Sequence, residues 1–214
     1  MTELDHIVVA ADTLEHGLAH VEAILGVEMP RGGAHPRMGT HNHLLRLGDT
    51  VFLEVIAIDP AAPAPLRPRW FQLDDPALQA ELRIAPRVLT WVVRTDHIAD
   101  VFLASRQPLG AIEPMSRNDL RWLITFRNDG ALVDDGMMPI VIQWPRGPHL
   151  ATRMPDLGCT LEGFEAAHRD PGAYRRDLAS IGADRHVEIR ATEPGARAYL
   201  VVHIRTPHGV RTVR

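Results

Sequence analysis

The sequence contains no lysine, a single cysteine and no long apolar run. All 23 basic residues are arginine. Without a lysine amine the chain cannot form a Schiff base, anchor pyridoxal phosphate or supply the lysine of a phosphate-binding loop. Cys159 alone cannot form an internal disulfide framework or a four-cysteine zinc site. Any metal site must therefore use nitrogen and oxygen ligands, for which 12 histidines are available.

Charge and hydropathy exclude further classes of partner. The formal net charge of −4 provides no positive field to attract nucleic acid. The longest apolar runs are strand-sized, far below the roughly 18 residues that span a bilayer, and the acidic N-terminus lacks the basic start of a signal peptide. No glycine-rich dinucleotide motif is present, so we expect neither NAD nor another nucleotide. These features favour a cytoplasmic protein that binds neither nucleic acid nor membranes.

Residues 1–58 show a β-α-β-β-β pattern. The helix has apolar residues at helical spacing; its N-cap is Asp12 or Thr13 and Gly26 ends it. A glycine- and proline-rich stretch after the helix is either a ragged strand or a loop over a site. The expected elements are a strand over 4–11, the helix over 14–25, the uncertain stretch over 29–39, and strands over 43–47 and 50–58.

The same pattern restarts after a linker and a short helix over residues 59–86. Residues 87–145 form a second module, and residues 157–214 a third, partial one. The second module has strands over 87–95, 111–115, 120–126 and 139–144, with a helix over 96–107 capped by Asp96. The third has strands over 161–168, 187–191, 199–205 and 210–213, with a helix over 171–181. We predict one compact α+β unit in which paired βαβββ modules form a curved sheet around a cavity, with the partial module at the C-terminus.

Several blocks within residues 4–145 resemble the glyoxalase-like domain of the vicinal oxygen chelate superfamily. The more specific ones are Gly39–Leu45 and the strand that carries Glu54, and further blocks cover 4–9, 67–71, 114–117 and 140–144. The resemblance implies the paired-module fold and a small-molecule cavity. It leaves the reaction open, because the superfamily contains isomerases, dioxygenases, transferases and drug-binding proteins of the bleomycin-resistance type. It also leaves open whether modules pair within one chain or between the chains of a homodimer.

The resemblance also implies a divalent metal, such as Zn, Ni, Fe or Mn, held by the first and fourth strands of each module. In the first module these positions are His6 and Glu54. In the second they are Thr90, or Trp91 if the register slips, and Gln143. Threonine is a poor ligand and tryptophan is none, so the set is incomplete. The alternative is that His6 and Glu54 form a buried polar pair.

Glu54 is the strongest candidate for a catalytic residue. Strand alternation places Phe52, Glu54 and Ile56 on one face, and an acid in so apolar a strand needs a metal, a cation or a proton beside it. Glu54 could therefore act as a base that removes a proton next to a polarised carbonyl.

The run His41-Asn42-His43 provides further candidates, of which alternation lets only one side face the cavity. We consider His41 for catalysis, or as an additional metal ligand, and Asn42 and His43 for substrate binding. Either histidine could instead shape a turn. Arg69 and Trp70 could close over an anionic substrate, and Trp144 could line the cavity, although both tryptophans could serve packing alone.

Two functions are compatible with the sequence. The first is a metal-dependent lyase, isomerase or dioxygenase acting on a small organic molecule with neighbouring oxygens. The second is a metal-free protein that sequesters a small, partly apolar molecule.

Overall fold

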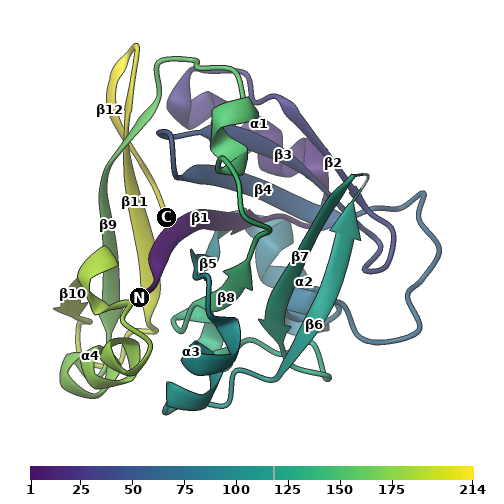
Figure 1. The fold of residues 1–214 in the computed structure, drawn as a ribbon. Coiled ribbons are helices and arrows are strands. Elements are labelled where there is room, and N and C mark those ends of the chain that lie inside the picture. The colour runs from purple at the N-terminus through teal and green to yellow at the C-terminus, as the bar shows by residue number, and fades with distance from the viewer. Residues whose placement is uncertain (118) are drawn as a thin grey trace.

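The computed structural model describes residues 1–117 and 119–214. Two βαβββ modules build one eight-stranded sheet that curves around a cavity, and C-terminal residues build a second, four-stranded sheet. Figure 1 shows the smaller sheet beside the larger one. The fold is therefore α+β with paired modules, as the sequence predicts.

The first module has the predicted helix with the predicted boundaries. The side chain of Thr13 accepts a hydrogen bond from the backbone N–H of His16 at 3.2 Å, and Gly26 ends the helix in a left-handed conformation with φ of 70°. The glycine-rich stretch after it forms a short edge strand. The elements are β1 (Glu3–Ala10), α1 (Leu14–Leu25), β2 (Arg31–His35), β3 (Thr40–Arg46) and β4 (Phe52–Ile58).

The second module repeats this order with a shorter helix than predicted. The helix begins at Ile98 and Asp96 does not cap it; the backbone N–H of Ile98 donates to the side-chain oxygen of Gln143 at 2.9 Å. The elements that link and build this module are η1 (Trp70–Gln72), α2 (Pro76–Ile84), β5 (Arg87–Arg94), α3 (Ile98–Ala104), β6 (Ala111–Arg117), β7 (Leu120–Phe126), η2 (Val133–Gly136) and β8 (Ile140–Gln143).

The large sheet has the strand order β2-β3-β4-β1-β5-β8-β7-β6. Each module pairs its first strand in parallel with its last, β1 with β4 and β5 with β8. The antiparallel pair β1–β5 joins the modules. The modules therefore pair within one chain, which resolves the question that the sequence leaves open.

Alternation along β4 separates two apolar layers. Phe52 and Glu54 line the cavity, whereas Leu53, Val55 and Ala57 belong to the core on the opposite face, which includes α1. The predicted facing of this strand is confirmed, and it places an acid on the concave side of the sheet.

The C-terminal residues contain the predicted elements, but their strands pair in the different order β10-β9-β11-β12. This sheet packs on the large sheet opposite the cavity, where the ring of Phe164 lies 5.3 Å from that of Trp91. Among the described helices, none has the length and apolar composition needed to cross a bilayer. The elements are η3 (Leu150–Arg153), β9 (Thr160–His168), α4 (Pro171–Ser180), η4 (Asp184–His186), β10 (Glu188–Ala191), β11 (Tyr199–Thr206) and β12 (Gly209–Val213).

Candidate functional site

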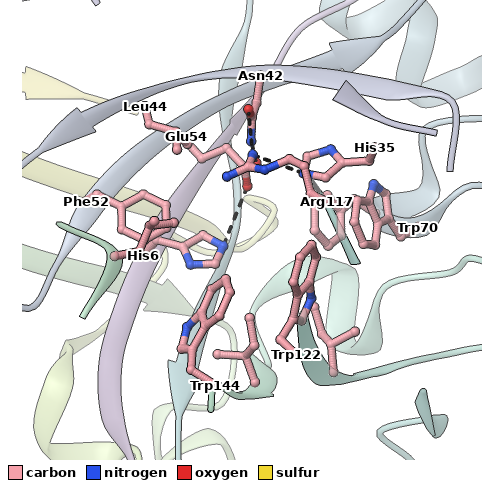
Figure 2. Close-up of a pocket in the computed structure, with 14 residues that line it drawn as sticks. His6, His35, Asn42, Leu44, Phe52, Glu54, Trp70, Arg117, Trp122 and Trp144 are labelled. Atoms are coloured by element: carbon pink, nitrogen blue, oxygen red, sulfur yellow. Dashed lines mark hydrogen bonds and ion pairs between the residues drawn. The ribbon is translucent and has the colours of Figure 1, made fainter. Parts of the chain in front are cut away.

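A cavity of about 420 Å³, counting its opening to solvent, lies on the concave face of the large sheet. At one end a cluster of polar side chains gathers, and tryptophan and phenylalanine rings line the remainder (Figure 2). A concave site with aromatic walls and a few convergent polar groups is the kind that binds a small organic molecule. The aromatic side chains are Phe52, Trp70, Phe71, Trp122 and Trp144.

Glu54 on β4 is the central group of the polar cluster. Its side chain is 6% exposed, its Oε1 accepts a hydrogen bond from Nδ2 of Asn42, and its Oε2 lies 3.6 Å from Nε2 of His6. Burial of a carboxylate without polar neighbours would be strongly unfavourable. The Asn42 amide is therefore the hydrogen-bond donor that makes an acid tolerable at this position.

Asp5 orients the His6 imidazole through the Nδ1 atom of that ring. The Asp5 carboxylate is fully buried and accepts hydrogen bonds from Nδ1 of His6 at 2.6 Å, Nε2 of His149 at 3.0 Å and Nε1 of Trp144 at 2.9 Å. Burial alone would raise the pKa of Asp5, but the hydrogen bonds from His149 and His6 outweigh it and hold that pKa well below its ordinary value. Asp5 is therefore an ionised carboxylate with three donors.

The hydrogen bonds also determine which ring nitrogens carry protons. The backbone N–H of Ala151 donates to Nδ1 of His149 at 3.2 Å, so the proton of that ring is on Nε2 and points at Asp5. His6 likewise donates from Nδ1 to the ionised Asp5. Its Nε2 is left to face Glu54 and the cavity, which is the orientation of a base or a metal ligand.

Arg117, at the end of β6, reaches the same cluster from the second module. Its Nη1 donates to Oδ1 of Asn42 at 3.1 Å and lies 3.4 Å from Nε2 of His35. Because a guanidinium only donates, both of these atoms are acceptors, and Nδ2 of Asn42 is the group that donates to Glu54. Burial, followed by the charge of Arg117, lowers the pKa of His35 to about 3, so His35 is neutral.

Five of the sequence candidates line this cavity, and they come from both modules and the linker between them. They are His6, Asn42, Glu54, Trp70 and Trp144.

His41 and His43 lie on the other face of β3. Nδ1 of His43 is 2.7 Å from the carbonyl oxygen of Met29, which belongs to the core on the helix side of the sheet. Alternation turns His41 the same way, and Asn42 is the member of the run that faces the cavity. These positions do not support the catalytic role considered for His41 or the substrate contact considered for His43.

Gln143 and Arg69 also lie away from the cavity. Gln143 is engaged at the start of α3, and alternation on β8 makes its neighbour Ile142 the lining residue instead. The guanidinium of Arg69 pairs with Asp74 at 2.6 Å. Neither residue is therefore placed for the metal or substrate contact that the sequence suggested.

The second module does not complete a metal site. Trp91 points to the opposite face of the sheet, where its Nε1 donates to the carbonyl oxygen of Met137 at 2.7 Å. Across residues 1–117 and 119–214, no three His, Cys, Asp or Glu side chains gather to hold an ion. A catalytic zinc takes three protein ligands and a non-haem iron two histidines and a carboxylate. His6 and Glu54 provide two donors, so the residues present do not fit such a set.

Sequence reasoning missed Asp5, His35, Arg117, Trp122 and His149. A break in the pairing of β1 with β5 between Leu4 and His6 disturbs the alternation that would send Asp5 away from His6. An acid and a histidine side by side in an apolar strand were the available signal for Asp5. Arg117 ends one of the blocks that carry the resemblance, and no local pattern marks the others.

Both the sequence and the fold of this chain are similar to those of known proteins. A family model described as "Glyoxalase-like domain" matches residues 4–182. A hypothetical protein from Staphylococcus aureus is similar in structure with a TM-score of 0.61 at 13% identity, over 93% of this chain and 88% of that one. Methylmalonyl-CoA epimerases from Streptomyces coelicolor (TM-score 0.45, 16% identity, 69% of this chain and 98% of that one) and Mycobacterium tuberculosis (0.41, 15%, 69% and 90%) are less similar in structure. No curated protein matches the sequence.

Proposed function

The chain belongs to the glyoxalase-like domain family, and on that premise we propose that it is a lyase or isomerase that transfers a proton on a small organic molecule. One observation carries the proposal. The Glu54 carboxylate lies beside the His6 imidazole, 3.6 Å away, at the polar end of a cavity lined by aromatic rings. Two groups able to exchange protons, each held by a further buried partner, are what such a reaction requires.

Each polar residue has a part in this reaction. Glu54 removes a proton from the carbon next to a carbonyl group, and His6 receives a proton or returns one to the substrate. Asp5 holds the imidazole by Nδ1 and stabilises its positive charge when Nε2 is protonated. General acid–base catalysis of this kind contributes about 10²- to 10⁴-fold to a rate. No step is assigned to a metal, because two donors do not make up the ligand set of a catalytic ion.

A second function is favoured by a different observation. Three of the four tryptophans line the cavity, and flat apolar walls suit the sequestration of a planar organic molecule. In that case Glu54 and His6 would orient the ligand without any transfer of protons.

Exchange of substrate hydrogen with solvent distinguishes the two functions. The protein is incubated in D₂O with a panel of small 2-oxo acids and 2-hydroxy ketones, in the presence of EDTA and separately with Zn²⁺, Ni²⁺ or Mn²⁺. Loss of the C–H signal is followed by NMR. We expect exchange with at least one compound and a decrease of about 10²-fold or more in Glu54→Gln. His41→Gln is the matched control, since it changes a histidine on the far face of β3.

Each outcome of this experiment supports one of the two functions or contradicts the role of Glu54. Exchange that depends on Glu54 supports the enzyme. A compound that raises the melting temperature of the protein but shows no exchange would instead establish the binding function. Exchange that Glu54→Gln leaves unchanged would contradict the proposed role of this carboxylate.

A further inference from the structure

The second module brings a buried cation to the polar end of the cavity. Arg117 is 8% exposed and lines the cavity beside Glu54, His6 and Trp122. Its guanidinium lies beside Asn42 and His35, in the polar cluster that Figure 2 shows. A buried guanidinium needs several acceptors, because it carries five N–H donors.

Those donors are only partly used. Within residues 1–117 and 119–214, the hydrogen bonds of the Arg117 side chain are made by Nη1 alone, to Asn42 at 3.1 Å and to His35 at 3.4 Å. Nε and Nη2 have no hydrogen-bond partner among these residues, so both can donate to a ligand in the cavity that Arg117 lines. Burial lowers the pKa of Arg117 and the nearby charge of Glu54 acts against that change, and an arginine remains charged at neutral pH.

The edge strand β2 leaves room for this arrangement. A Cβ atom at Gly33 would lie 3.2 Å from Cδ of Arg117, and one at Gly32 would lie 2.2 Å from Oδ1 of Asn42. The N–H of Gly33 also donates to that same oxygen at 2.9 Å. Two consecutive glycines thus allow the guanidinium and the amide to occupy the positions that they have.

We propose that Arg117 is the electrophile of the reaction, binding the carbonyl oxygen of the substrate and stabilising the enolate that forms when Glu54 removes the neighbouring proton. This inference rests on the proposed function and assigns the substrate class: a small carbonyl compound with an acidic C–H bond. The second module would then supply a cation where metal ligands are missing.

The step balances without any co-reactant. The C–H bond breaks, its proton goes to the carboxylate of Glu54, and its electron pair becomes the enolate, whose negative oxygen accepts hydrogen bonds from Nε or Nη2 of Arg117. Return of the proton to carbon regenerates the carbonyl group and Glu54. A fixed cation in a cavity sheltered from water stabilises such charge strongly, and loss of one donor group costs about 10²- to 10³-fold in rate.

The test compares Arg117→Met and Arg117→Lys with the control Arg121→Met, which removes an exposed arginine from the adjacent strand. We expect Arg117→Met to reduce kcat for solvent exchange by about 10²-fold or more. Arg117→Lys should lose less, and added guanidinium ion should restore part of the activity of Arg117→Met. Oxalate, a planar oxyanion, should raise the melting temperature of the wild type and not of Arg117→Met.

A milder variant covers the case in which Arg117→Met fails to fold. Gly33→Ala pushes against Cδ of Arg117 and keeps the guanidinium, so it should lower kcat by roughly 10-fold. Wild-type exchange together with an unchanged rate in Arg117→Met, or in Gly33→Ala if the former does not fold, overturns the role of Arg117 alone. Absence of exchange in the wild type overturns the proposed function itself.

Discussion

On the first strand of the first module His6 faces the cavity, and at the corresponding place in the second module stands Thr90, whose partner across the β1–β5 pair is Val8. On the fourth strands Glu54 lines the cavity in the first module and Ile142 in the second. The modules share their order of elements and strand pairing, but the first carries the histidine and the carboxylate of the cavity, and the second an apolar wall with one buried arginine.

This difference shows what a repeated scaffold determines. Pairing and alternation decide which face of each strand lies toward the cavity. They do not decide which side chains occupy that face. The family fold therefore predicts where the chemistry lies, and the residues of each module must be examined separately to predict what it is.

The largest expected effect on the unfolding free energy comes from breaking the buried network around Asp5, in which its carboxylate accepts three hydrogen bonds. Asp5→Asn places an amide where three donors converge, so the protein should lose about 3–5 kcal/mol of unfolding free energy. Asp12→Asn is the matched control: Asp12 also lies 2.6 Å from a histidine, His16, but at the surface. The control should cost less than about 1 kcal/mol. Urea denaturation measures both, and equal losses would contradict a special role for the buried network.

His35, at the seam between the modules, should make stability depend on pH. Its folded pKa is about 3 and its ordinary value 6.5, so between these pH values the unfolded chain binds more protons. Unfolding free energy should therefore fall as pH decreases through 6.5, by about 2 kcal/mol at pH 5 from this group. His35→Gln removes this contribution, and His97→Gln, at an exposed histidine, is the control. Identical pH slopes in His35→Gln and wild type would contradict the lowered pKa.

The sequence predicts the fold well because its determinants are local. The helix between Thr13 and Gly26 follows from its N-cap residue, the helical spacing of its apolar residues and the glycine that ends it. The orientation of Glu54 toward the cavity follows from the alternation of side chains along one strand. The resemblance implies Gln143 as the fourth-strand ligand of the second module, but nothing in the sequence of the short strand β8 shows which side of it is inward. Ile142 takes that place in the structure.

The missed site residues depend on contacts between distant parts of the chain. His149 reaches Asp5 across 144 positions, and Arg117 reaches Asn42 across 75. Such contacts follow from the curvature of the sheet and the path of the segment after β8, which no local pattern encodes. His6 and Glu54 could be predicted because both belong to one module, and their supporting groups could not.

At Thr90 we expect a smaller change in unfolding free energy, and in the stabilising direction. Its hydroxyl is buried, and no hydrogen-bond partner for it lies among the described residues. Thr90→Val should therefore be neutral or stabilise the protein by about 1 kcal/mol. Thr125→Val is the control, because Oγ1 of Thr125 accepts the backbone N–H of Val141 at 3.0 Å and its loss should destabilise by about 1–2 kcal/mol. A marked loss of stability in Thr90→Val would mean that this second-module position binds a polar partner after all.

The smallest effect on the unfolding free energy is expected where the two edge strands of the large sheet, β2 and β6, approach each other. This second contact between the modules lies on the side away from the β1–β5 pair. Glu113 on β6 accepts hydrogen bonds from Arg37, which follows β2, and from Arg67 of the linker. The hydrogen bond from Arg67 is the main reason that the pKa of Glu113 is lowered. Arg37 is nearly half exposed, so water and salt screen this cluster.

Glu113→Gln should therefore cost less than about 1 kcal/mol at low salt, and the cost should shrink further in 1 M NaCl. Solvent exchange should proceed at the wild-type rate, because Glu54, His6 and Arg117 keep their partners. A loss of more than about 2 kcal/mol, insensitive to salt, would show that closing the edges holds the modules together as strongly as a buried network does. In that case the modules would be joined by ion pairs on one side as firmly as by β1 and β5 on the other.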